Sequence, residues 1–208
     1  MRILACHSDG DRSIRVVETP SDGSRLYFED GVLYTHIDAA GNNRLEYVAA
    51  MARAVGRASE VLVLGTAGGA LATQLSRGGS QVTAVDNVAA AFDIARRWFH
   101  LPPTVTCVHA DAFAFLRETQ GRWDAIAIDV FHGLDIPDSM LTTEIGALLA
   151  GRLEPGGSIV WNVADGAQSL SAHWIVKALR LAGLKPSLVS VLPGDMGNTL
   201  IVCRSTPI

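Results

Sequence analysis

The sequence predicts an α/β protein built on a doubly wound, mainly parallel sheet, and three observations lead to this class. Strand-like and helix-like patterns alternate from about residue 43 to residue 182, which is typical of βαβ units. A glycine-rich turn at residues 65–69 separates an apolar strand from a helix. Asp86 ends the next strand, about 20 residues further on, where nucleotide-binding βαβ units hold a ribose.

A small β unit precedes this series. Strand patterns at residues 25–28 and 32–37 flank Asp30-Gly31, which is a strong hairpin signal between apolar runs. A further strand pattern covers residues 13–18. We therefore predict two units, a β unit at residues 1–40 and a main domain at residues 41–208.

The main domain should begin with a helix that ends near Gly56, because apolar residues recur on one helical face from Leu45 to Val55. A last helix near residues 168–182 should bury Leu170, Trp174, Ala178 and Leu181. The chain should close with an antiparallel hairpin at residues 188–192 and 199–203. The strands expected between these helices lie at residues 61–64, 81–86, 104–108, 124–129 and 158–163, and a further long helix lies near residues 139–153.

The bulk composition limits the classes of function. With 49% apolar and 18% charged residues, the 208-residue chain is expected to fold around a sizeable core. A net charge of −4 without a basic cluster argues against nucleic acid as a partner. The three scattered cysteines lack metal-ligand spacing, so we expect no metal site. No apolar run is long enough for a signal peptide or a membrane span, and we expect a soluble, cytoplasmic protein.

The glycine turn and Asp86 together indicate a nucleoside pocket. A turn without bulky side chains lets a ligand approach the backbone at a helix N-terminus, and a carboxylate at the tip of the next strand can accept from two ribose hydroxyls. The alternative is that the glycines only pack a helix closely on the sheet.

Beyond these features, several segments resemble spermidine synthase and its relatives within the class I S-adenosylmethionine-dependent methyltransferase fold, over about residues 13 to 205. Residues 28–33 are similar to the family's LDGVIQ-type segment, and residues 82–99 to its VTLVEID…LAKKYF strand and helix. The remaining similar pieces are residues 110–115 (GDGFEF), 124–129 (YDVIITD) and 137–141 (PAESLF). The resemblance implies a Rossmann-like sheet of class I methyltransferase type.

The resemblance also implies a donor site. Asp86 would hold the ribose diol, Asp111 would accept from the adenine amino group, and Asp129 would border the sulfonium or the amine. The other residues expected around the adenosyl group are Gly65, Ala67, Gly68, Gly69, Asn87 and Ala112. For two of the acids a plainer role stays open, since Asp111 could be a helix N-cap and Asp129 a solvated strand-end carboxylate.

The departures from the family pattern concern the acceptor side. His132 stands where the family's D-S-S-D-P loop has its second aspartate. The family's Y-Q-E becomes Tyr47-Val48-Ala49, and its P-T-Y-P becomes residues 191–193, with Leu192 in place of a polyamine-lining residue. Because carboxylates are lost there, we expect Tyr47, Val48 and Leu192 to line a site for a less charged acceptor than a polyamine.

Transfer from a sulfonium carbon is a displacement that needs in-line positioning and a nucleophile with a free lone pair. A histidine can accept the nucleophile's proton at neutral pH, so His132 is the candidate base, with Asp129 beside it and Asp135 as an orienting partner or substitute. A surface role for His132 is the alternative. Tyr47 and Trp161 could face the positive sulfur, although core packing is the favoured interpretation for Trp161.

Three functions remain in competition. The leading one is a transferase that uses S-adenosylmethionine or its decarboxylated form, with methyl transfer ahead of aminopropyl transfer and a small-molecule acceptor. The second is an aminopropyltransferase with a remodelled acceptor site, and the third is an adenosyl-nucleoside-binding protein without turnover. A nicotinamide enzyme is disfavoured because residues 65–70 fit GxGxxG poorly. The strand edges of the β unit and the resemblance together predict a homodimer.

Overall fold

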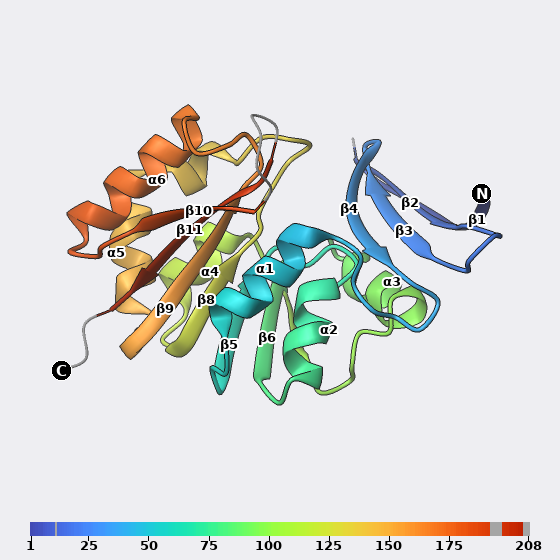
Figure 1. Ribbon diagram of the computed structural model, residues 1–208, viewed down its shortest axis with the longest axis horizontal. Helices are drawn as coiled ribbons and strands as arrows, with labels where there is room; N and C mark the ends of the chain where they lie inside the picture. Colours follow the sequence, from blue (N-terminus) through green and yellow to red (C-terminus); the bar gives the residue numbers. More distant parts are fainter. Residues whose placement is uncertain (11, 192–196, 206–208) are drawn as a thin grey trace.

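The computed structural model describes residues 1–10, 12–191 and 197–205. It contains two sheets, which Figure 1 shows side by side (blue strands, and green to red strands). The smaller sheet is an antiparallel meander of four strands, β1 (Arg2–Asp9), β2 (Arg12–Glu18), β3 (Arg25–Glu29) and β4 (Val32–Ile37).

The predicted hairpin in this sheet is confirmed. Glu29 pairs with Val32, so Asp30 and Gly31 alone form the turn. Both turn residues have positive φ, 48° and 83°, which is the backbone that a two-residue turn requires and that an Asp-Gly pair tolerates. Strand β1 was not predicted, and it forms the edge of the sheet by pairing with β2.

The larger sheet has seven strands in the order β10-β11-β9-β8-β5-β6-β7. Pairing is parallel from β9 through β8, β5 and β6 to β7, and antiparallel where β11 joins β9 and β10 joins β11. The predicted parallel sheet with a closing antiparallel hairpin is therefore confirmed. Its strands are β5 (Glu60–Leu64), β6 (Gln81–Asp86), β7 (Thr106–His109), β8 (Trp123–Ile128), β9 (Leu153–Val163), β10 (Ser187–Ser190) and β11 (Thr199–Arg204).

Helices cover both faces of this sheet, as a doubly wound fold requires. One buried cluster joins a first set of helices to the sheet: α1 (Glu46–Val55), α2 (Ala70–Arg77) and α3 (Ala91–Trp98). A second cluster lies on the other face and joins α4 (Ala112–Glu118), the short 3₁₀ helix η1 (Asp138–Leu141), α5 (Thr143–Gly151) and α6 (Leu170–Leu181).

The small sheet packs against the end of α3. The Tyr27 ring, which is fully buried, meets the Phe99 ring edge to face with centroids 6.1 Å apart. The Arg25 guanidinium donates to the Trp98 carbonyl at 2.9 Å. This packing brings the ends of β3 and β4 over the carboxyl edge of the large sheet, on the side of β6 (Figure 1).

The predicted buried face of α6 is wrong. Of the four residues expected in the core only Ala178 is buried, while Leu170 and Leu181 are 79% and 67% exposed. The helix instead buries Ala172, Ile175, Ala178 and Leu179. The reason is a close approach to α5, where any side chain at Gly146 would overlap the Ala178 carbonyl, and small residues permit that approach. The predicted helix near residues 139–153 is also divided, into η1 and α5.

No helix in the described part of the chain is long and apolar enough to cross a membrane.

Candidate functional site

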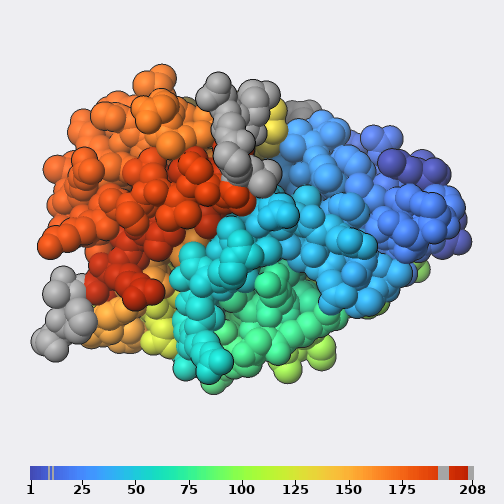
Figure 2. Space-filling view, in the orientation of Figure 1, coloured from blue at the N-terminus to red at the C-terminus, as the bar shows by residue number. Residues whose placement is uncertain are grey.

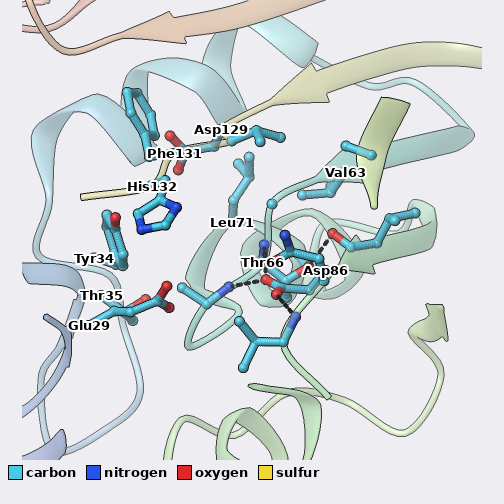
Figure 3. Close-up of a pocket in the computed structure, with 18 of the residues that line it drawn as sticks. Glu29, Tyr34, Thr35, Val63, Thr66, Leu71, Asp86, Asp129, Phe131 and His132 are labelled. Carbon is cyan, nitrogen blue, oxygen red and sulfur yellow. Dashed lines mark hydrogen bonds between the residues drawn. The ribbon is translucent and has the colours of Figure 1, made fainter. Parts of the chain in front are cut away.

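A cavity of about 190 Å³ lies at the carboxyl ends of β5, β6 and β8. Its floor is the glycine turn after β5, one side is the end of β6, and the small sheet contributes the opposite side (Figure 3). Open α/β sheets bind ligands at this edge. In the space-filling view the blue residues of the small sheet abut the cyan and green residues of the large domain (Figure 2).

The glycines of the turn let strands β5 and β8 end close together, and they let neighbouring elements pack against the turn. Gly65 has φ of +82°, and a Cβ there would overlap the Asp129 carbonyl, so only glycine lets β5 and β8 end side by side. Gly65 and Ala67 line the cavity. Gly68 and Gly69 do not line the cavity. Gly68 packs against Thr35 of the small sheet and Gly69 against Leu101, and a side chain at either glycine would crowd that neighbour.

Asp86 accepts hydrogen bonds from three backbone N–H groups, two of them in the glycine turn. Its Oδ2 accepts from Thr66 at 2.8 Å and from Ala67 at 2.9 Å, and its Oδ1 accepts from Val88 at 2.9 Å (dashed lines in Figure 3). A carboxylate offers about four acceptor positions, so part of that capacity faces the cavity. The next residue, Asn87, also lines the cavity.

Asp111 is the N-cap of α4, since its Oδ1 accepts from the Ala114 N–H at 2.9 Å. The capping interpretation is thus confirmed, and the residue lines the cavity as well, together with Ala112. Only one carboxylate oxygen is used by the cap, and the other is open to a ligand that donates a hydrogen bond.

Asp129 lies at the end of β8 and is half-buried, with its open side on the cavity. Burial raises its pKa from 3.8 to about 6, although hydrogen bonds from the Asn162 amide, at 2.8 Å, and from the Tyr47 hydroxyl oppose the rise. Asn162 is fixed in turn by the Asn198 amide at 2.9 Å. Asp129 is therefore not the solvated strand-end carboxylate of the alternative interpretation.

His132 follows in the loop after β8, at the rim of the cavity. Its backbone pairs with Asp135 in both directions, at 2.8 and 3.1 Å, which closes a tight turn. The Tyr34 hydroxyl ties that turn to the small sheet by donating to the Gly133 carbonyl at 2.7 Å. The Asp135 side chain is exposed and does not line the cavity, and its hydrogen bonds with His132 join backbone groups.

The residues expected near an acceptor are distributed differently. Val48 is buried and lines the cavity. Tyr47 stands behind Asp129, and its hydroxyl also approaches the Tyr34 carbonyl at 3.3 Å. Leu192 lies outside the described residues. Trp161 is fully buried in the core, as its favoured interpretation predicted.

Glu29, Arg12 and Tyr34 line the cavity from the small sheet, and none of them was predicted to be a site residue. Glu29 is only 6% exposed, and burial raises its pKa, while Arg12 and His132 oppose the rise. Arg12 donates to the Asn87 amide oxygen at 2.7 Å and so bridges the two sheets. The available signal was the acid itself, because the LDGVIQ-type segment has leucine where this chain has Glu29.

Among the described residues, no group of three or more His, Cys, Asp or Glu side chains is arranged to hold a metal ion.

Comparison with known proteins identifies the class of fold. A family model described as a methyltransferase domain matches residues 61–157. A probable polyamine aminopropyl transferase of Bifidobacterium longum is 29% identical over 119 residues, which are 55% of this chain and 27% of that protein. The chain thus spans about a quarter of the length of this curated relative.

Solved structures are similar over more of the chain. A probable spermidine synthase from Corynebacterium glutamicum superposes with a TM-score of 0.84 at 22% identity, covering 98% of this chain and 81% of that one. Spermidine synthase from Thermotoga maritima gives 0.71 at 15% identity, covering 97% and 72%. The N-methyltransferase NodS from Bradyrhizobium japonicum gives 0.60 at 20% identity, covering 77% and 95%.

The protein has a class I methyltransferase fold. More particularly, it has the spermidine synthase-like form of that fold, in which a small antiparallel sheet precedes the Rossmann-like domain. This fold suggests a transferase related to those that use S-adenosylmethionine.

Proposed function

We propose that the chain is a transferase that binds S-adenosylmethionine or its decarboxylated form in this cavity and moves an alkyl group, with methyl favoured, to a small acceptor of low charge. The observation that carries the proposal is the convergence of Asp86, Asp111 and Asp129 around the glycine turn, at the edge where this fold class binds ligands. NodS is similar in fold and has been solved with S-adenosylhomocysteine.

The nucleoside would lie along the ends of β6 and β7. The free oxygen of Asp111 would accept from the adenine amino group, and the one acceptor position left on Asp86 would take a ribose hydroxyl. The sulfonium would then lie toward Asp129, whose negative charge favours a cation beside it.

The reaction is a single displacement. The acceptor's lone pair forms a bond to the alkyl carbon, the carbon–sulfur bond breaks, and its electron pair remains on sulfur as a neutral thioether. The acceptor's proton goes to His132 or Asp129. A carboxylate with a pKa of about 6 is a better proton acceptor at neutral pH than an ordinary aspartate, and it is still mostly ionised there.

Aminopropyl transfer from the decarboxylated donor is the second candidate, and a specific observation favours it. The N–H groups of the turn are already used, by Asp86 for residues 66 and 67, by the Thr35 hydroxyl for residue 68, and by a backbone carbonyl for residue 69. Of the described residues that line the cavity, four are carboxylates and one, Arg12, is an arginine. Such a site has little to offer the α-carboxylate of S-adenosylmethionine.

The two candidates yield different products, so one experiment separates them. The chain is incubated with each donor and a panel of amines and alcohols, and the products are identified by mass spectrometry. Methyl transfer produces S-adenosylhomocysteine, and aminopropyl transfer produces methylthioadenosine. We expect turnover of a singly charged or neutral acceptor, and slower turnover in His132→Gln. Binding of adenosyl compounds without turnover of any acceptor would instead favour a non-catalytic binding protein.

We also propose a homodimer. The edge strand β1 leaves Ile3 60% exposed, and exposed apolar strand edges are commonly covered by another chain. Light scattering at micromolar concentration should give twice the mass of the chain, and a clean monomer would refute the proposal.

A further inference from the structure

Glu29 is a buried carboxylate whose side chain faces the cavity without being fully used by the protein. It is the last residue of β3, and its side chain is 7% exposed. The Tyr27 hydroxyl donates to Oε2 at 3.5 Å, the limit for a hydrogen bond. The nearest Arg12 nitrogen is 3.7 Å from Oε1, since that nitrogen makes its short bond to Asn87 instead.

A buried carboxylate with only long contacts to the protein needs further hydrogen-bond donors. Carboxylate oxygens accept about four hydrogen bonds, and leaving a buried charge partly unsatisfied destabilises the protein. Burial is the main cause of the raised pKa of Glu29, and of its charged neighbours Arg12 and His132 oppose the rise while Asp86 and Asp30 add to it. A ligand that brings positively charged N–H groups would satisfy Glu29 better than one with hydroxyls.

Glu29 lies on the side of the cavity away from the turn that Asp86 holds, although Arg12 links it to Asn87. Figure 3 shows Glu29, Tyr34 and His132 together on one side of the cavity, with Asp86 and its hydrogen-bonded turn on the other. Tyr34 is fixed by its bond to Gly133, and this bond also fixes the loop that carries His132. The candidate base and the unsatisfied carboxylate therefore border the same part of the cavity.

We propose that Glu29 binds the ammonium group of the acceptor and holds it beside His132, so that the acceptor is a small primary amine with a single positive charge. This inference rests on the proposed function. Glu29 supplies one negative charge to the cavity from the small sheet. Val48, which also lines the cavity, is apolar and adds no charge for a second ammonium group.

Binding prepares the amine for the displacement. The bound ammonium gives one proton to the His132 imidazole and becomes a neutral amine with a free lone pair. That lone pair then attacks the alkyl carbon, and the sulfur leaves as the thioether. Glu29 selects and orients the amine, and it keeps its own charge throughout.

The test is titration calorimetry on the full chain saturated with methylthioadenosine. The probes are n-butylamine, butane-1,4-diamine and 1-butanol. We expect n-butylamine to bind at least about tenfold more tightly than 1-butanol, and the diamine to gain nothing from its second charge. In Glu29→Gln the preference for the amine over the alcohol should disappear, while affinity for methylthioadenosine stays within about twofold.

Two further variants make the result specific. Glu18→Gln removes a carboxylate from the same sheet that pairs with Arg2 and Arg25 outside the cavity, and it should leave all four affinities unchanged. Glu29→Asp keeps the charge and should keep part of the preference for the amine. Circular dichroism melting checks that each variant folds.

Three outcomes would overturn the inference. The first is an unchanged preference for the amine over the alcohol in Glu29→Gln. The second is a loss of methylthioadenosine affinity in that variant as large as its loss of amine affinity, which would assign Glu29 to the nucleoside. The third is a diamine that binds tenfold more tightly than n-butylamine. The proposed function fails separately, and the inference with it, if the wild-type chain binds neither methylthioadenosine nor either donor.

Discussion

Replacing Asp129 with asparagine should stabilise the protein at neutral pH and remove one component of its pH dependence. Burial holds the pKa of this carboxyl at about 6 in the folded chain, against an ordinary value of 3.8. The folded state therefore binds the proton more tightly than the unfolded state does. Stability from this group is fully present below about pH 4 and is lost as the pH rises through 6.

The size of the effect follows from the two pKa values. Each pH unit between them is worth about 1.4 kcal/mol, and because the unfolded chain is already partly ionised at pH 4, the wild type should lose about 2 kcal/mol relative to the variant between pH 4 and pH 7. Asparagine has the same shape and does not ionise. Its carbonyl oxygen can still accept from the Asn162 amide, so the substitution should not break the network behind the site.

The assay is urea unfolding of both proteins at half-unit steps from pH 4 to pH 8. Subtracting the two curves of unfolding free energy cancels the other titrating groups. Asp135→Asn, on the exposed part of the same loop, is the matched control for a change of charge outside the cavity. If the difference for Asp129→Asn does not change with pH, or if the variant is the less stable protein at pH 7, the assignment of a destabilising, partly buried carboxylate is wrong.

Three other substitutions follow from the structure. Gly65→Ala should cost at least about 3 kcal/mol in urea unfolding, because its Cβ would overlap the Asp129 carbonyl at a positive φ, whereas Gly151→Ala, in open space at the end of α5, should cost almost nothing. Equal costs would contradict that packing. Asp86→Ala should lose about 2 kcal/mol because three backbone N–H groups lose their acceptor. A loss below the error of the fit would mean that water replaces the carboxylate. Trp174→Ser should change the free energy of unfolding by less than about 0.5 kcal/mol, since the ring lies on the exposed face of α6; a loss of 2 kcal/mol would restore the predicted burial of that face.

The alternation of strands and helices was predictable because each element carries its own period. Apolar residues recur at helical spacing in α1, and Asp30-Gly31 alone specifies the hairpin turn. The buried face of α6 was not predictable, because the helix has apolar residues on two faces. The contact with Gly146 of α5, far away in the sequence, decides which face is buried. Strand β1 was missed for a similar reason, since its pairing with β2 defines it rather than any alternation of its own.

Some residues of the candidate site could be predicted from the sequence, and others could not. Asp86, Asp111 and Asp129 follow strands, and the ends of parallel strands meet at one edge, so their convergence could be predicted locally. Glu29 and Tyr34 reach the cavity only because the small sheet packs on α3 through contacts such as Arg25 to Trp98. These contacts join residues far apart in the sequence, so no local sequence pattern predicts them. The acceptor side of the cavity was therefore predicted only in part.

The central claim is that an adenosyl nucleoside lies over the glycine turn, held by Asp86 and Asp111. Thermal unfolding with S-adenosylmethionine, its decarboxylated form, methylthioadenosine and NAD tests it directly. An adenosyl compound at about 100 times its dissociation constant should add about 2.7 kcal/mol to the stability of the wild type, and nothing to Asp86→Ala. NAD should have no effect. An equal gain in wild type and Asp86→Ala, or a gain with NAD alone, would contradict the account.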